Sequence, residues 1–127
     1  MTTPHSRCRL GKATKAIHGG HSGETVFGEV STPIYQSSTF AFPSAEEGAA
    51  RFAGESPGFI YTRMGNPTVK ALEECIAELE GGYGGMATSS GMAAITTVFL
   101  GFLEQGAHLV GTDSVYGPTR VVLEKEF

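Results

Sequence analysis

The sequence has little that would place the protein in a membrane or outside the cell. Long apolar runs are missing from its 127 residues, and none approaches the roughly 20 residues of a membrane helix. The polar segment Met1–Arg9 is not followed by an apolar stretch, so a secretory signal is not indicated. We therefore expect a cytoplasmic protein without a membrane partner.

Cysteine and basic residues are also scarce. Cys8 and Cys75 are the only cysteines, and their wide separation matches no metal-ligand spacing, so we expect free thiols and no metal site. Lysine and arginine together number 9 against 13 acidic residues, which gives a net charge of −4. This charge lacks the basic footprint of a nucleic-acid-binding protein, so we expect no nucleic-acid partner.

Glycine is abundant, with 18 residues that follow no repeat, and many of them interrupt the first half of the chain together with proline. Residues 1–60 show little periodicity, so we predict an extended N-terminal arm that lies on a partner subunit. Within this arm, a short helix is expected at 44–52. Ser44 is its predicted N-cap, and Glu47 three residues later completes a capping-box pattern.

A stronger helix signal begins at Asn66. Asparagine is a favoured N-cap, and Pro67 at the first helical position loses no useful hydrogen bond. Gly81 and the glycine after it end the predicted helix. Its apolar residues recur at helical spacing on one face: Val69, Leu72, Ile76 and Leu79.

Beyond this helix, short strands are predicted at 85–88 and 108–111, and helices at 92–103 and 121–127. Alternating helices and strands indicate an α/β domain with a mainly parallel sheet, which we expect to occupy residues 61–127. Because the last helix has no stop signal, we expect the chain to be truncated after Phe127. Unpaired strand edges and uncovered helix faces would make it aggregation-prone or partly unfolded.

Three places in this pattern could bind a ligand. Ser89, Ser90 and Gly91 form a small-residue turn that opens a helix, where free N–H groups and the helix dipole favour phosphate. An ordinary capped helix is the alternative. Arg63 is a planar, permanently charged fork that suits phosphate, and Tyr61 adds a phenolic donor. Here the alternative is a solvated arginine beside a packing tyrosine.

The third place is Tyr116, which follows the second predicted strand. Ligands collect at the carboxyl ends of strands in open α/β sheets, and an aromatic ring there could stack on a flat cofactor. A tyrosine that packs on the sheet rim is the alternative. Each of the three signals is weak when it is taken alone.

Taken together, in this order and spacing, the segments from Tyr61 to Tyr116 resemble the trans-sulfuration family of pyridoxal 5′-phosphate (PLP) enzymes, which act in cysteine and methionine metabolism. The upstream segment 31–40 is also similar to this family. The run 44–68 looks most like methionine γ-lyase-like members. The resemblance covers about residues 12–127, almost the whole chain.

The resemblance implies the N-terminal part of the PLP-dependent transferase fold (fold type I, aspartate aminotransferase-like), with PLP as cofactor. The positions of Tyr61 and Arg63 would reach into a neighbouring subunit's site and hold the PLP phosphate. Ser90, Gly91 and Met92 would hold the same phosphate from their own subunit. Tyr116 would stack on the pyridine ring and take part in proton transfer. The implied assembly is a homodimer or homotetramer with shared active sites.

The implied activity is a PLP-dependent carbon–sulfur lyase of sulfur amino acid metabolism, of the methionine γ-lyase or cystathionine β/γ-lyase type. Cystathionine γ-synthase or O-acetylhomoserine sulfhydrylase, acting on an activated homoserine, is the alternative. In the family, the lysine that bonds PLP and the aspartate that pairs with its ring nitrogen lie beyond residue 127. No lysine of this chain occupies that position, so we expect the chain alone to be inactive.

One residue departs from the methionine γ-lyases, which typically carry a cysteine two residues after the stacking tyrosine. This chain has Pro118 there, and Tyr-Gly-Pro-Thr resembles some cystathionine-processing members instead. Two further possibilities remain at this point: a non-catalytic truncated module that docks on a full-length enzyme through its arm, or a remnant without a function of its own.

Overall fold

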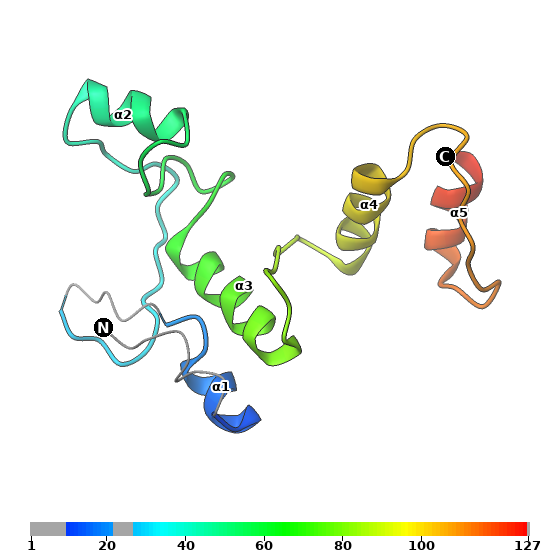
Figure 1. Cartoon of the computed structure of the whole chain (residues 1–127), viewed down its shortest axis with the longest axis horizontal. Helices are drawn as coiled ribbons and strands as arrows, with labels where there is room; N and C mark the ends of the chain where they lie inside the picture. Colours follow the sequence, from blue (N-terminus) through cyan, green and yellow to red (C-terminus); the bar gives the residue numbers. More distant parts are fainter. Residues whose placement is uncertain (1–9, 22–26, 127) are drawn as a thin grey trace. The chain divides into compact units, whose positions relative to one another are not determined.

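The structure is a computed structural model that describes residues 10–21 and 27–126. The predictions that involve Met1–Arg9, Cys8 and Phe127 lie outside the described residues. Contacts divide the chain into two units, Met1–Met86 and Ala87–Phe127, which are treated separately below. The helices of the described part are α1 (Lys12–His18), α2 (Ala45–Phe52), α3 (Pro67–Glu80), α4 (Gly91–Phe102) and α5 (Gly117–Lys125) (Figure 1).

In the first unit, α1 packs against α3. Gly19 and Gly20, which follow α1, allow the close approach. Gly20 has φ +69°, and a Cβ placed on it would lie 1.9 Å from the carbonyl oxygen of Ala71 in α3. Lys15 Nζ donates to the carbonyl of Glu78 at 3.2 Å. Helix α1 is not predicted by the sequence pattern. It has seven residues and no side-chain cap at Gly11, so its stability comes from packing on α3.

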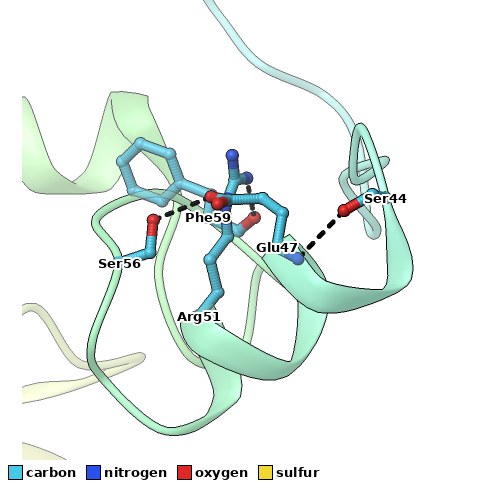
Figure 2. Close-up of polar contacts among 5 residues, drawn as sticks. All are labelled: Ser44, Glu47, Arg51, Ser56 and Phe59. Carbon is cyan, nitrogen blue, oxygen red and sulfur yellow. Dashed lines mark hydrogen bonds and ion pairs between the residues drawn. The ribbon is translucent and has the colours of Figure 1, made fainter.

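Helix α2 confirms the predicted short helix and its cap. Ser44 Oγ accepts from the backbone N–H of Glu47 at 3.2 Å. The Glu47 carboxylate accepts from Arg51 Nε at 2.8 Å and from Ser56 Oγ at 2.7 Å, while Arg51 Nη1 donates to the Phe59 carbonyl (Figure 2). These bonds fold the chain after α2 back onto the helix.

The pKa of Glu47 gives a test of this cluster. Hydrogen bonds from Ser56 and then Arg51 lower the pKa of the Glu47 carboxyl below its usual range. Because the folded pKa lies below the unfolded one, ionised Glu47 stabilises the cluster above about pH 4.3, and this stabilisation is lost as the pH falls through the folded pKa. We expect Ser56→Ala to raise the pKa of Glu47, measured by NMR titration of its side-chain carboxyl.

Glu46 is the internal control for this titration. The pKa of Glu46 is lowered by a hydrogen bond to its own backbone and by a hydrogen bond with the Ser44 side chain. Ser56→Ala should therefore leave the pKa of Glu46 unchanged. An unchanged pKa of Glu47 in Ser56→Ala would show that the Ser56 bond does not form in solution.

Helix α3 confirms the predicted start and stop. Asn66 Oδ1 accepts from the N–H of Thr68 at 2.9 Å, Pro67 occupies the first turn, and Gly81 ends the helix with φ +66°. The segment before α3 is bound to the upstream segment 33–40. The contacts between them include an antiparallel bridge between Thr39 and Tyr61.

The second unit contains α4 and α5, which contact each other. Ser90 caps α4 through a bond from the N–H of Ala93 to its Oγ, at 3.1 Å. Thr119, in the first turn of α5, is 6% exposed, and its hydroxyl donates to the Met92 sulfur at 3.5 Å. The first turns of the two helices are therefore in direct contact.

Two expectations for this half of the chain need correction. The segments 85–88 and 108–111 do not form strands in the structure. A strand requires a paired neighbouring strand, and the isolated β-bridge of the described residues joins Thr39 and Tyr61 instead. Helix α5 begins at Gly117 and not at residue 121. Pro118 lies in its first turn, where proline is well suited, so the helix starts earlier than its apolar residues indicate.

Burial is low in both units. None of the apolar side chains in the described residues is buried, and the predicted apolar face of α3 is open, with Leu72 55% and Ile76 47% exposed. The described helices are all too short or too polar to cross a membrane. Surfaces of this kind are normally covered in a folded protein.

Candidate cofactor site

Arg63 and Tyr61 lie together on a tight turn that precedes α3. The Tyr61 carbonyl accepts from the N–H of Met64 at 2.8 Å and of Gly65 at 3.1 Å, which closes the turn. The Arg63 guanidinium carbon lies 4.9 Å from the centre of the Tyr61 ring, a cation–π arrangement. Both side chains are exposed, and Arg63 has no carboxylate partner within the described residues.

Hydrogen bonds to the upstream segment hold this turn in place. The Thr62 N–H donates to the Ser38 carbonyl at 2.9 Å, and the Thr62 hydroxyl donates to the Ser37 carbonyl. The Phe40 N–H donates to the Ile60 carbonyl at 3.1 Å. The two segments line an open groove of about 860 Å³ that includes Tyr61 and Arg63. A fixed cation beside a phenol is a suitable arrangement for an anionic ligand.

Asn66 contributes more to this turn than its sequence pattern reveals. Besides capping α3, its Nδ2 donates to the Tyr35 carbonyl at 2.9 Å and to the Thr62 hydroxyl at 3.0 Å. The Asn-Pro pattern indicates a helix start and gives no sign of these longer-range bonds. Asn66 is thus absent from the predicted site residues, although it contacts the residue between Tyr61 and Arg63.

The start of α4 carries the second group of predicted residues. Ser90 is extended (φ −163°), its carbonyl accepts from the N–H of Ala94 at 3.0 Å, and its Oγ accepts from Ala93. The N–H groups of Gly91 and Met92 therefore lie before the first donors that the helix itself can use. They stand at the positive end of the helix dipole.

These residues fit a phosphate group. A Cβ placed on Gly91 would meet no atom within 4 Å, so the surface beside the first turn of α4 is open at this residue. Because Ser90 Oγ serves the cap as an acceptor, its hydroxyl proton remains free to donate. The start of α4 thus offers three donors of the kind that binds a phosphate at a helix N-terminus.

Tyr116 is the residue immediately before α5. Its carbonyl accepts from the N–H of Arg120 at 3.2 Å, while its side chain makes no capping bond and is 68% exposed. Within the second unit, the contact between Thr119 and Met92 links α5, which follows Tyr116, to α4, which begins at Gly91. Tyr61 and Arg63 belong to the first unit and form a separate group.

Comparisons with known proteins agree with the resemblance seen in the sequence. Residues 13–127 match the family described as Cys/Met metabolism PLP-dependent enzyme. The L-methionine gamma-lyase of Porphyromonas gingivalis is 50% identical over 111 residues, which are 87% of this chain and 28% of that protein. The cystathionine gamma-lyase of Bacillus subtilis is 48% identical over 114 residues, 90% of this chain and 28% of that protein.

A solved structure gives the same result for the fold. The putative O-acetylhomoserine (thiol)-lyase of Campylobacter jejuni, which carries N′-pyridoxyl-lysine-5′-monophosphate, has a TM-score of 0.85 and 31% identity. It matches 93% of this chain, which covers 29% of that structure. The chain therefore spans somewhat more than a quarter of the length of its relatives. It belongs to the Cys/Met metabolism family of PLP-dependent enzymes.

Proposed function

We propose that this chain is the N-terminal part of a PLP-dependent lyase that breaks the carbon–sulfur bond of a sulfur amino acid. The observation that carries the proposal is the pair of anion-binding groups, Arg63 with Tyr61 and the start of α4 at Ser90–Met92. Both fit a phosphate, and the chain belongs to a PLP-dependent family. We infer that the segment 1–60 is an inter-subunit arm and that 61–127 begins the large domain, with a parallel sheet formed together with further strands.

In the proposed site, each residue has a defined task. Arg63 and Tyr61 would bind phosphate oxygens of PLP held by a neighbouring subunit. The Ser90 hydroxyl and the N–H groups of Gly91 and Met92 would bind the phosphate of the PLP held by their own subunit. The Tyr116 ring stacks on the cofactor, and its phenolic oxygen exchanges a proton with the substrate. When bound, PLP supplies an electron sink that allows the α-proton of an amino acid to leave.

We further propose that the site is shared between two subunits of a homodimer, itself part of a homotetramer. Tyr61 and Arg63 are exposed on the first unit and lie in an open groove, so their side chains are free to serve a neighbouring molecule. The apolar face of α3 is also uncovered in this chain and is available to a neighbouring subunit or to the rest of the protein.

The proposal extends to the choice of substrate. Methionine γ-lyase and cystathionine γ-lyase relatives are almost equally similar to this chain, so identity does not separate them. Pro118 favours cystathionine, because the cysteine of typical methionine γ-lyases is absent and a proline in the first turn of α5 offers no thiol.

The complete protein, purified with PLP, should release a 2-oxo acid and a thiol from L-cystathionine more efficiently than from L-methionine. Coupled assays for the two products, reported as kcat/KM, measure this ratio. The matched variants are Pro118→Cys, expected to raise the relative rate with methionine, and Pro118→Ser as the control without a thiol.

Other outcomes point to the remaining functions. Replacement chemistry on an activated homoserine in place of elimination would favour the synthase or sulfhydrylase function. A protein that binds a full-length relative without any turnover would favour the docking module.

A further inference from the structure

The side-chain amide of Asn66 is fully used and is aimed at the turn that carries Arg63. Asn66 is 4% exposed, and its three polar contacts join three separate groups: the Thr68 N–H, the Tyr35 carbonyl and the Thr62 hydroxyl. We propose that Asn66 is a positioning residue for the PLP phosphate, because its amide holds the Tyr61–Arg63 turn in the geometry that binds the anion. This proposal rests on the proposed function.

Thr62 is the link between Asn66 and the binding side chains. It lies between Tyr61 and Arg63 in the chain, and its hydroxyl accepts from Asn66 Nδ2 while donating to the Ser37 carbonyl. Its N–H is bonded to the Ser38 carbonyl. The middle of the turn is thus fixed from two directions, by the segment 35–38 and by the start of α3.

A cap alone does not require asparagine. Serine and aspartate cap helices about as well, since each offers an oxygen to the N–H two or three residues on. Neither can replace Nδ2, which donates to both Tyr35 and Thr62. Substitution at this position therefore separates the capping of α3 from the positioning of the turn.

Asn66→Ser and Asn66→Asp keep the cap and remove the two amide bonds. Losing both lets the turn sample other geometries, so Arg63 spends less time where the phosphate needs it. With each bond contributing modestly, we expect the affinity of the complete apoprotein for PLP to fall on the order of tenfold. The affinity for pyridoxal, which lacks the phosphate, should stay unchanged.

The experiment measures equilibrium binding of PLP and of pyridoxal by absorbance for the wild type, Asn66→Ser, Asn66→Asp and Arg63→Ala. Circular dichroism checks that the helices are retained. The expected result is a lower PLP-to-pyridoxal affinity ratio for all three variants. Asn66→Ser serves as the main variant because it introduces no buried charge.

Three results would overturn the proposal, and they distinguish its failure from the failure of the phosphate site. If Arg63→Ala lowers the ratio but Asn66→Ser does not, or if Asn66→Ser weakens both ligands equally, Asn66 is only structural and the phosphate site stands. If Arg63→Ala also leaves the ratio unchanged, the phosphate site at this turn fails, and the proposal fails with it.

Discussion

A Gly91→Asp variant of the complete protein is expected to bind PLP on the order of a hundredfold more weakly, with α4 intact. The new carboxylate would face the cofactor phosphate at a few ångströms, where two like charges repel by about 3 kcal/mol. The described residues leave room for the new Cβ, because a Cβ placed on Gly91 meets none of their atoms within 4 Å. An acidic residue in the first turn also suits the helix dipole.

Stability and cofactor affinity should therefore change independently in Gly91→Asp. Equilibrium PLP binding and the thermal midpoint of the apoprotein measure the two effects. Gly91→Ala is the matched control, since it adds a methyl group at the same position without a charge. A charged variant that binds PLP as tightly as the alanine variant would remove the start of α4 from the phosphate site.

The same variant tests whether subunits share a site. In a mixed dimer of Gly91→Asp and Arg63→Ala subunits, one site would carry both defects, and the other would have an intact Gly91 with the partner's intact Arg63. PLP binding at that second site should recover to the wild-type affinity. If each site used only its own chain, both would stay defective.

The largest structural effect is expected from Gly20→Ala. Alanine in the left-handed region costs roughly 1 kcal/mol. In addition, its Cβ would lie 1.9 Å from the Ala71 carbonyl oxygen, so α1 must move away from α3. Overpacking of this kind adds on the order of 2 kcal/mol. The backbone amides of α1 should therefore lose protection from hydrogen exchange in this variant.

Gly81→Ala is the control for this experiment. Gly81 has nearly the same backbone conformation, with φ +66°, but its Cβ would meet nothing within 4 Å. The difference between the two variants isolates the helix contact, and we expect about thirtyfold lower α1 protection for Gly20→Ala. Equal effects of the two substitutions would mean that α1 does not pack on α3 in solution.

These features also show what the sequence could and could not predict. The starts of α2, α3 and α4 follow from local signals, since Ser44, Asn66 and Ser90 each cap the helix beginning one residue later. The strands at 85–88 and 108–111 depend on distant partners, which no local pattern supplies. Helix α1 is a similar case, because its stability depends on α3 and its own signals are weak.

The candidate site divides in the same way. Arg63, Tyr61 and the residues at the start of α4 are visible in the sequence because their chemistry suits a phosphate. The bonds from Asn66 to Tyr35 and Thr62 span 31 and 4 residues, and only the folded chain brings these groups together. A residue that acts through its neighbours leaves no distinct chemical pattern of its own.

The open apolar faces of the helices have a thermal consequence. Heat-capacity change on unfolding arises mainly from apolar surface that becomes exposed to water. Because none of the apolar side chains in the described residues is fully buried, melting this chain by itself would expose less apolar surface than melting a compact domain of the same length. Its heat-capacity change on unfolding would therefore be smaller than that of such a domain, and its stability would vary with temperature with less curvature.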